Sequence, residues 1–215
     1  MPESILSVTL RSLYVSSTAA FIAFASALAL SAILARVPRR RAEMALGVFE
    51  ALVGVPTTVI GLFVYMLLHP HSPLGFTRLL YTPIAIIIGQ FFVALPMAFT
   101  SMFRPFYELR ESVKELVLSL GCSEKLATKV LLGELAPVLT SSYLLAFSRA
   151  IGELGVALMV GGGIEGYTSV LTTAIAVRTS IGDYEVAIQI GLILLCITIS
   201  LALMLKALGE RVLWR

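Results

Sequence analysis

The chain has 215 residues, of which 58% are hydrophobic and only 13% are charged, and its mean hydropathy is +0.96. In soluble domains about a quarter of all residues are charged, so this composition predicts an integral membrane protein. The formal net charge of +3 is small, and the basic residues form no single patch, which argues against nucleic-acid binding. Cys122 and Cys196 lie far apart in the sequence and form neither a disulfide framework nor a metal-ligand spacing.

Five apolar runs are candidates for membrane-spanning helices. A hydrocarbon core about 30 Å thick needs roughly 20 apolar residues in a helix. Runs with few or no charges place the spans near residues 12–35, 47–68, 81–103, 138–160 and 186–207. Pro56 and Pro96 fall inside spans, which membrane helices tolerate because neighbouring groups satisfy the freed backbone. The prediction is an all-α integral membrane protein with one transmembrane domain, residues 1–215.

The distribution of Lys and Arg predicts the orientation in the membrane. Cytoplasmic loops carry an excess of these residues. Twelve of them follow spans one, three and five, whereas the other side has only Arg11, Arg78 and Arg178. We therefore expect five crossings of the cell membrane, with the N-terminus outside and the C-terminus in the cytoplasm.

The longest charged segment, about residues 108–137, lies between the third and fourth spans and is expected in the cytoplasm. Apolar residues recur at helical spacing in its first half, which predicts an amphipathic helix. Gly121 is placed to end this helix and Ser123 to cap a second one. Gly133 and Pro137 are placed to end the second helix before span four. Such a hinged pair suits either the lipid surface or a groove on another protein, and its mixed charges favour the protein.

Arg149 and Glu153 form the one pair of opposite charges inside a predicted span. Ionisable residues at membrane depth are costly and usually face the bundle interior or a water-filled path. Their i,i+4 spacing allows them to pair on one helical face. Two interpretations stay open: a pair that holds helices together, and a direct role in an anion path.

Glycines and threonines follow at the expected outer end of span four. The glycines permit a sharp turn and could also leave amides free to bind an anion, although a plain turn is the favoured interpretation. The threonine hydroxyls are possible donors to an oxyanion on the same side. These candidates for a translocation path or gate are Gly161, Gly162, Gly163, Thr168, Thr172 and Thr173.

The charged segment resembles the EAA loop of permease subunits in ATP-binding-cassette (ABC) importers. The resemblance rests on Glu115, on Gly121 six residues later, and on Pro137 after an apolar pair. Leu116 and Val117 stand where the loop usually has two alanines. In that family the loop forms coupling helices that dock on a separate ATPase subunit, so the resemblance implies a type I importer core in which Glu115, Gly121, Ser123 and Pro137 belong to the docking element.

A second resemblance points to the molybdate, tungstate and sulfate importers. Residues 148–155 read Ser-Arg-Ala-Ile-Gly-Glu-Leu-Gly, similar to a run in those permeases. Residues 159–164 (Met-Val-Gly-Gly-Gly-Ile) and 170–175 (Val-Leu-Thr-Thr-Ala-Ile) are most like the tungstate branch, which usually has Asn at the position of Gly163. The resemblance covers nearly the whole chain.

These resemblances imply a set of partners. A second copy of the chain would complete the pathway, two ATPase subunits would bind ATP and Mg²⁺, and an extracytoplasmic binding protein would deliver the oxyanion. The chain has no Walker A pattern, so we expect it to bind no cofactor and to catalyse no reaction itself.

Two other classes of function are less favoured. A stand-alone secondary transporter or channel could also use the Arg149–Glu153 pair, but it predicts inverted repeats, which this sequence lacks. A membrane enzyme needs a nucleophile–base set or a metal cluster. His69 and His71 flank a proline in an expected outer loop without other nearby ligands, which is a weak metal signal.

Overall fold

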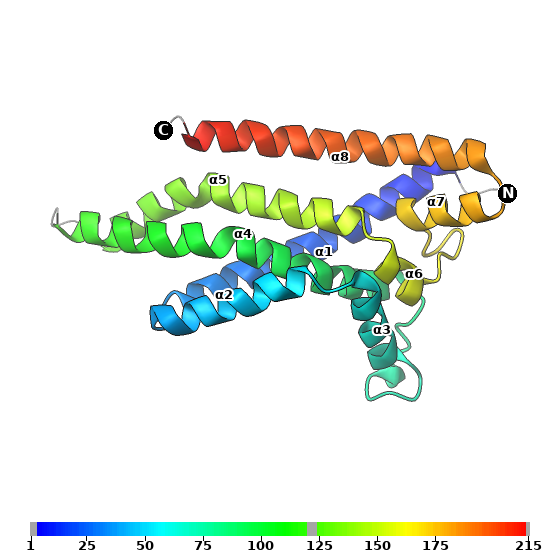
Figure 1. Ribbon diagram of the computed structural model, residues 1–215, viewed down its shortest axis with the longest axis horizontal. Coiled ribbons are helices and arrows are strands. Elements are labelled where there is room, and N and C mark those ends of the chain that lie inside the picture. Colours follow the sequence, from blue (N-terminus) through cyan, green and yellow to red (C-terminus); the bar gives the residue numbers. More distant parts are fainter. Residues whose placement is uncertain (1–3, 120–123, 214–215) are drawn as a thin grey trace.

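The computed structural model describes residues 4–119 and 124–213. The regular secondary structure of these residues is entirely helical. The helices are α1 (Ile5–Leu34), α2 (Arg39–Val53), α3 (Thr57–Leu68), the 3-10 helix η1 (Gly75–Thr77), α4 (Pro83–Ser119), α5 (Glu124–Ile151), α6 (Gly155–Gly161), α7 (Leu171–Ser180) and α8 (Tyr184–Leu213). The prediction of an all-α protein is confirmed for these residues. Helices α1, α4, α5 and α8 run along the long axis, and α3 projects away from them (Figure 1).

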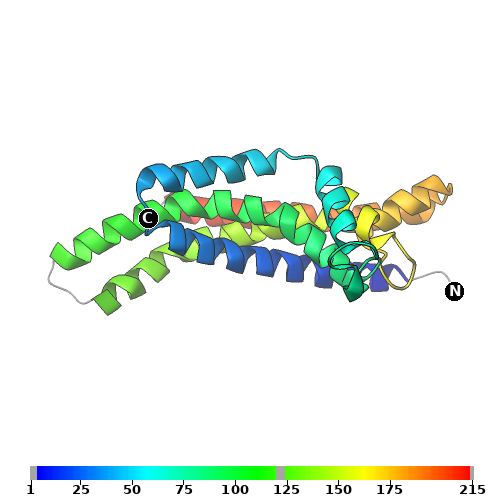
Figure 2. The same cartoon turned by 90° about the horizontal axis from the view of Figure 1, so that it is seen from below.

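Small residues allow the central helices to approach closely. Alanines of α1, α4 and α5 are fully buried in one cluster with Phe99 and Met102: Ala20, Ala23, Ala27, Ala94, Ala98, Ala146 and Ala150. The alanines of α1 in this cluster therefore pack against other helices of the same chain. Figure 2 shows α1, α4 and α5 side by side in the view from below.

Three of the five expected spans are single helices that are long and apolar enough to cross a membrane: Ile5–Leu34, Pro83–Arg110 and Tyr184–Ala207. The other two differ from the prediction because each consists of two helices that meet at an angle at a short break. Helices α2 and α3 meet at 97°, and residues 133–151 of α5 meet α6 at 59°. Residues 4–119 and 124–213 thus contain three candidate spans, or up to five if each bent pair crosses once.

The expected short helices of the charged segment are the ends of two long helices. Helix α4 continues to Ser119, and α5 begins at Glu124 and runs through both Gly133 and Pro137 to Ile151. The prediction that Gly133 and Pro137 end a helix is therefore wrong. Pro137 stays in the helix, as Pro96 and Pro105 do in α4, because packed neighbours can compensate for the missing hydrogen bond.

The last turns of α4 and the first turns of α5, which we call the hairpin tip, extend beyond the other helices (Figures 1 and 2). At 1.5 Å per residue, α4 is about 55 Å long, well over the roughly 30 Å of a hydrocarbon core. Helix α4 is therefore longer than a helix needs to be to cross a membrane once. Gly121 and Ser123, the predicted hinge and cap, lie outside the described residues.

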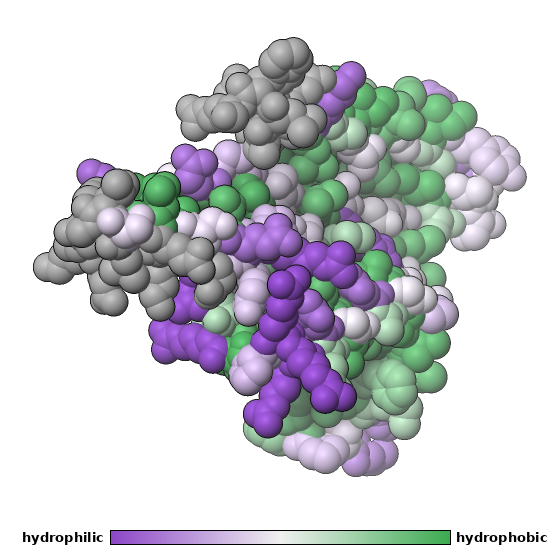
Figure 3. Space-filling model, turned by 60° about the vertical axis from the view of Figure 1, so that its left-hand side comes forward, coloured by the Kyte–Doolittle hydropathy of each residue, from purple (hydrophilic) through white to green (hydrophobic). Residues whose placement is uncertain are grey.

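The hairpin tip, the 34–39 link and the C-terminus lie at the same end of the molecule (Figure 1). This is the end to which the sequence assigns twelve Lys and Arg residues. Figure 3 shows hydrophilic side chains gathered on the side turned toward the viewer, while hydrophobic ones cover much of the receding side.

Candidate functional site

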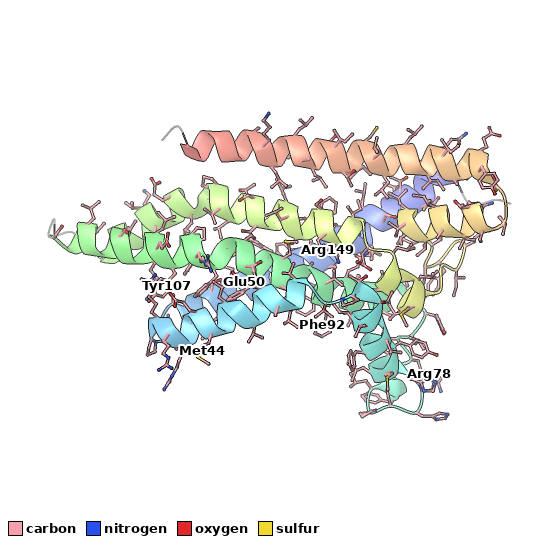
Figure 4. The ribbon with its side chains drawn as sticks, viewed as in Figure 1. Met44, Glu50, Arg78, Phe92, Tyr107 and Arg149 are labelled. Carbon is pink, nitrogen blue, oxygen red and sulfur yellow. The ribbon has the colours of Figure 1, made fainter. Side chains whose placement is uncertain are left out.

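The predicted pairing of Arg149 with Glu153 is confirmed. Arg149 lies in the last turn of α5, and its Nη1 donates a hydrogen bond of 2.9 Å to Glu153 Oε2. The Glu153 side chain is only 3% exposed and that of Arg149 is 31% exposed. A buried carboxylate without a partner is costly, so this arginine stabilises the charge of Glu153. Figure 4 shows Arg149 at the end of α5 that faces α6.

Glu153 also holds the two helices that follow it. Its Oε1 accepts a hydrogen bond of 3.1 Å from the backbone N–H of Val156 in the first turn of α6, where a negative charge is favourable. Its backbone carbonyl accepts one of 2.8 Å from Thr172 Oγ1 in α7. Glu153 therefore connects α5, α6 and α7. We call Arg149, Glu153 and Thr172 the joint.

Helix α6 packs very closely against α3 and α4 because glycines face it. A Cβ added at Gly89 of α4 would overlap Val156 Cγ1, and one at Gly61 of α3 would lie 3.1 Å from Met159 Sδ. A Cβ at Gly155, the first residue of α6, would lie 3.1 Å from Thr57 Oγ1. The position of α6 relative to the joint is thus fixed by close contacts on two sides.

The three predicted glycines form the turn after α6. Gly161 ends the helix, and Gly162 and Gly163 have positive φ values of 73° and 62°, which glycine adopts at little cost. The Gly162 amide donates to Leu158 O at 2.9 Å, and the Ile164 amide donates to Thr168 Oγ1 at 2.9 Å. These two amides are therefore used within the protein, which fits a structural turn better than an anion-binding nest.

The three predicted threonines are buried around this turn. Thr168 Oγ1 donates to Gly161 O at 2.6 Å. Thr173 Oγ1 accepts from the Val170 amide at 2.9 Å, and Thr172 Oγ1 bonds Glu153 O. Their hydroxyls hold the turn and the start of α7 together, and direct contact with an anion stays a prediction.

Residues of α1 that sequence reasoning missed also hold this region. Ser12 Oγ accepts a hydrogen bond of 2.7 Å from the Leu171 amide at the start of α7, and Arg11 Nη1 donates one of 2.8 Å to Ser169 O. The two segments are separated by about 158 residues, so only the polar character of an otherwise apolar helix could have indicated them.

Among the predicted coupling residues, Pro137 shares α5 with Arg149 of the joint and lies near the middle of that helix. Glu115 belongs to α4 and Pro137 to α5, while Gly121 and Ser123 lie outside the described residues. Helix α5 connects the hairpin tip and the joint without a break, over about 42 Å at 1.5 Å per residue.

An apolar helical fold with one basic end and a buried polar joint is typical of a membrane transport subunit. Residues 11–214 match the family described as "Binding-protein-dependent transport system inner membrane component". The chain belongs to this family of ABC transporter permeases.

Known relatives cover most of the chain. It is 35% identical over 199 residues to the tungstate uptake system permease protein TupB of Peptoclostridium acidaminophilum, covering 93% of this chain and 87% of that protein. It is 31% identical over 212 residues to a probable anion ABC transporter permease protein of Haloferax volcanii, covering 96% and 90%. The sulfate transport system permease protein CysT of Escherichia coli is 28% identical over 164 residues, covering 73% and 59%.

Proposed function

We propose that this chain is the transmembrane subunit of an ATP-driven importer of an oxyanion, with tungstate as the first candidate. Its similarity to TupB, 35% identical over 93% of the chain, is the observation that carries the choice of substrate. A second tungstate permease, from Campylobacter jejuni, is 34% identical over 68% of the chain. Sulfate and molybdenum permeases are 27–28% identical over smaller shares, so molybdate and sulfate are the second candidates.

The basic end of the molecule is proposed to face the cytoplasm. The α4–α5 hairpin would then extend beyond the membrane, where two ATPase subunits can bind it. Those subunits carry ATP and Mg²⁺, and this chain carries neither. The joint and α7 would lie near the outer face, where an extracytoplasmic binding protein delivers its oxyanion.

Helix α5 offers a physical route from ATP hydrolysis to the anion path. When the ATPase subunits close, they displace the hairpin tip. Because α5 is continuous from Glu124 to Ile151, the displacement reaches the joint at its other end. Glu153 passes it to α6 and α7, which line the proposed outer gate together with Gly161–Gly163. Two copies of the chain enclose the path and alternate between inward- and outward-facing states.

A secondary transporter is the alternative of a different class. It would need no ATPase, and the long α4–α5 hairpin would then have no assigned partner. The requirement for ATP separates the two.

The experiment is uptake by proteoliposomes that contain this chain, its ATPase and its binding protein. We expect tungstate to accumulate only when ATP is present on the side of the membrane that the ATPase subunits face. Gly121→Asp should abolish coupling because a charged side chain at this predicted hinge would interfere with docking. Uptake without ATP, or normal coupling in Gly121→Asp, would contradict the proposal.

A further inference from the structure

A large pocket with several polar side chains in a mostly apolar lining lies at the tip of α3, outside the site described above. Its volume is about 790 Å³, and it is formed by the end of α3 and the segment that joins α3 to α4. The side chains with polar groups in its lining are Tyr65, His69, Ser72, Arg78 and Tyr81. Figure 4 shows Arg78 at the tip of α3, away from the main bundle.

The backbone of this pocket is held in an unusual conformation. Arg78 and Tyr81 have φ values of 51° and 61°, and no other non-glycine residue in the described part of the chain has a positive φ. This conformation costs a side-chain-bearing residue roughly 1–2 kcal/mol, and such residues concentrate at ligand clamps and switches. A Cβ added at Gly75 would overlap the carbonyl oxygens of His69 and Pro70. The turn is therefore closed tightly, and it keeps both side chains on the pocket.

The pocket offers positive charge and hydrogen-bond donors without a counter-ion. The sequence has no Asp or Glu between residues 51 and 107, which includes all of α3 and the joining segment. Arg78 is exposed, and it forms no ion pair with any acidic side chain that the structure describes. The Tyr65 and Tyr81 hydroxyls hydrogen-bond each other, so the pair has one further O–H donor to offer, and His69 adds an imidazole. Such a set suits an anion.

The pocket also contacts the proposed outer gate. The Tyr81 amide donates a hydrogen bond of 2.8 Å to Val160 O near the end of α6. A Cβ added at Gly162 would lie 3.0 Å from Tyr81 Cδ1. Tyr81 thus lines the pocket and also packs against the glycine turn.

We propose that this pocket is a low-affinity receiving site for a free tetrahedral oxyanion, with Arg78 as its charged ligand. The inference rests on the proposed function and adds to it the place where the substrate first meets this chain. The pocket is much larger than one such anion, so waters bridge part of the contact. One cationic side chain and retained hydration keep the affinity low, as a site that must release its ion requires.

Direct binding of tungstate to the permease in nanodiscs, without ATPase or binding protein, tests the proposal. Equilibrium dialysis with elemental analysis measures the bound metal. Arg78→Asn removes the guanidinium and keeps a residue that tolerates positive φ. Arg78→Lys restores the charge, and Arg40→Gln is the matched control because it removes an exposed arginine at the opposite end.

We expect wild-type protein and Arg40→Gln to bind tungstate equally, in the millimolar range. Arg78→Asn should bind about tenfold more weakly, which corresponds to the loss of one charge-assisted hydrogen bond, and Arg78→Lys should recover most of the binding. Equal binding by Arg78→Asn and wild-type protein would overturn the inference.

A second experiment distinguishes two possible ligands of Arg78. A carboxylate side chain on the binding protein could pair with the guanidinium in the same way as a free oxyanion. We expect Arg78→Asn to capture the binding protein as well as wild-type protein does. If capture is lost while tungstate binding is retained, Arg78 serves the partner and the inference is overturned. If the complete system transports tungstate but the permease alone binds none, the inference fails and the proposed function stands.

Discussion

Thr172 donates a hydrogen bond of 2.8 Å from its Oγ1 to the backbone carbonyl of Glu153. Both residues are buried, with Glu153 2% and Thr172 8% exposed. This bond ties α7 to the short link between α5 and α6, while the Glu153 carboxylate ties the same link to Arg149 and Val156. A movement of α5 therefore cannot leave α6 and α7 in place without breaking one of these bonds.

Replacing Thr172 with Val should weaken this connection. The change keeps the shape of the side chain but leaves the buried Glu153 carbonyl without its donor, at a cost of about 1–3 kcal/mol. We expect a lower melting temperature in detergent and slower uptake. Thr172→Ser keeps the hydroxyl and is the control. Equal stability of the Val and Ser variants would show that the bond contributes nothing.

The Arg149–Glu153 pair should show strong coupling in a double-mutant cycle. Arg149→Met leaves a buried carboxylate unpaired, and Glu153→Gln leaves the guanidinium without its counter-charge. The double variant should lose less stability than the sum of the losses in the two single variants. We expect this difference, the coupling free energy, to be roughly 0.5–3 kcal/mol. Thermal unfolding of the four proteins measures it. Additive effects would mean that the two residues act independently.

Close packing of α6 predicts a sharp difference between two Gly→Ala variants. At Gly89 the added methyl would overlap Val156 Cγ1, so α6 must shift, and we expect loss of stability and of uptake. At Gly47 in α2 nothing lies within 4 Å of an added Cβ. Gly47→Ala should leave uptake unchanged and raise stability slightly, because Ala favours a helix by up to about 1 kcal/mol. Equal behaviour of both variants would contradict the packing.

Single cysteines can test the orientation. In a background without Cys122 and Cys196, a cysteine at Ser72 should react with a membrane-impermeant maleimide in intact cells. A cysteine at Arg40 should react only after permeabilisation. The reverse pattern would place the basic end outside and remove the basis for ATPase docking on the hairpin.

Local sequence patterns predicted the long apolar helices and the contact between residues four apart on one helix. The uncharged runs located α1, α4 and α8 as membrane-spanning candidates, and the i,i+4 spacing predicted the Arg149–Glu153 pair.

The sequence did not indicate which prolines break a helix. Pro56 lies in the break between α2 and α3, which meet at 97°, whereas Pro96, Pro105 and Pro137 stay inside helices. A proline removes the same hydrogen bond in each place, so tertiary packing decides whether the helix continues. The bonds from Ser12 and Thr172 to the joint region were also not predictable, because they join segments that only the fold brings together.

We propose that ATP hydrolysis on a partner subunit drives this chain to import an oxyanion, with tungstate as the first candidate. The most direct measurement is ATP hydrolysis by the complete reconstituted importer, with the binding protein loaded in turn with tungstate, molybdate or sulfate. We predict the strongest stimulation with tungstate, and none when this chain carries Gly121→Asp. Stimulation by sulfate alone would contradict tungstate as the substrate, and no stimulation by any of the three would contradict ATP-driven oxyanion import by this chain.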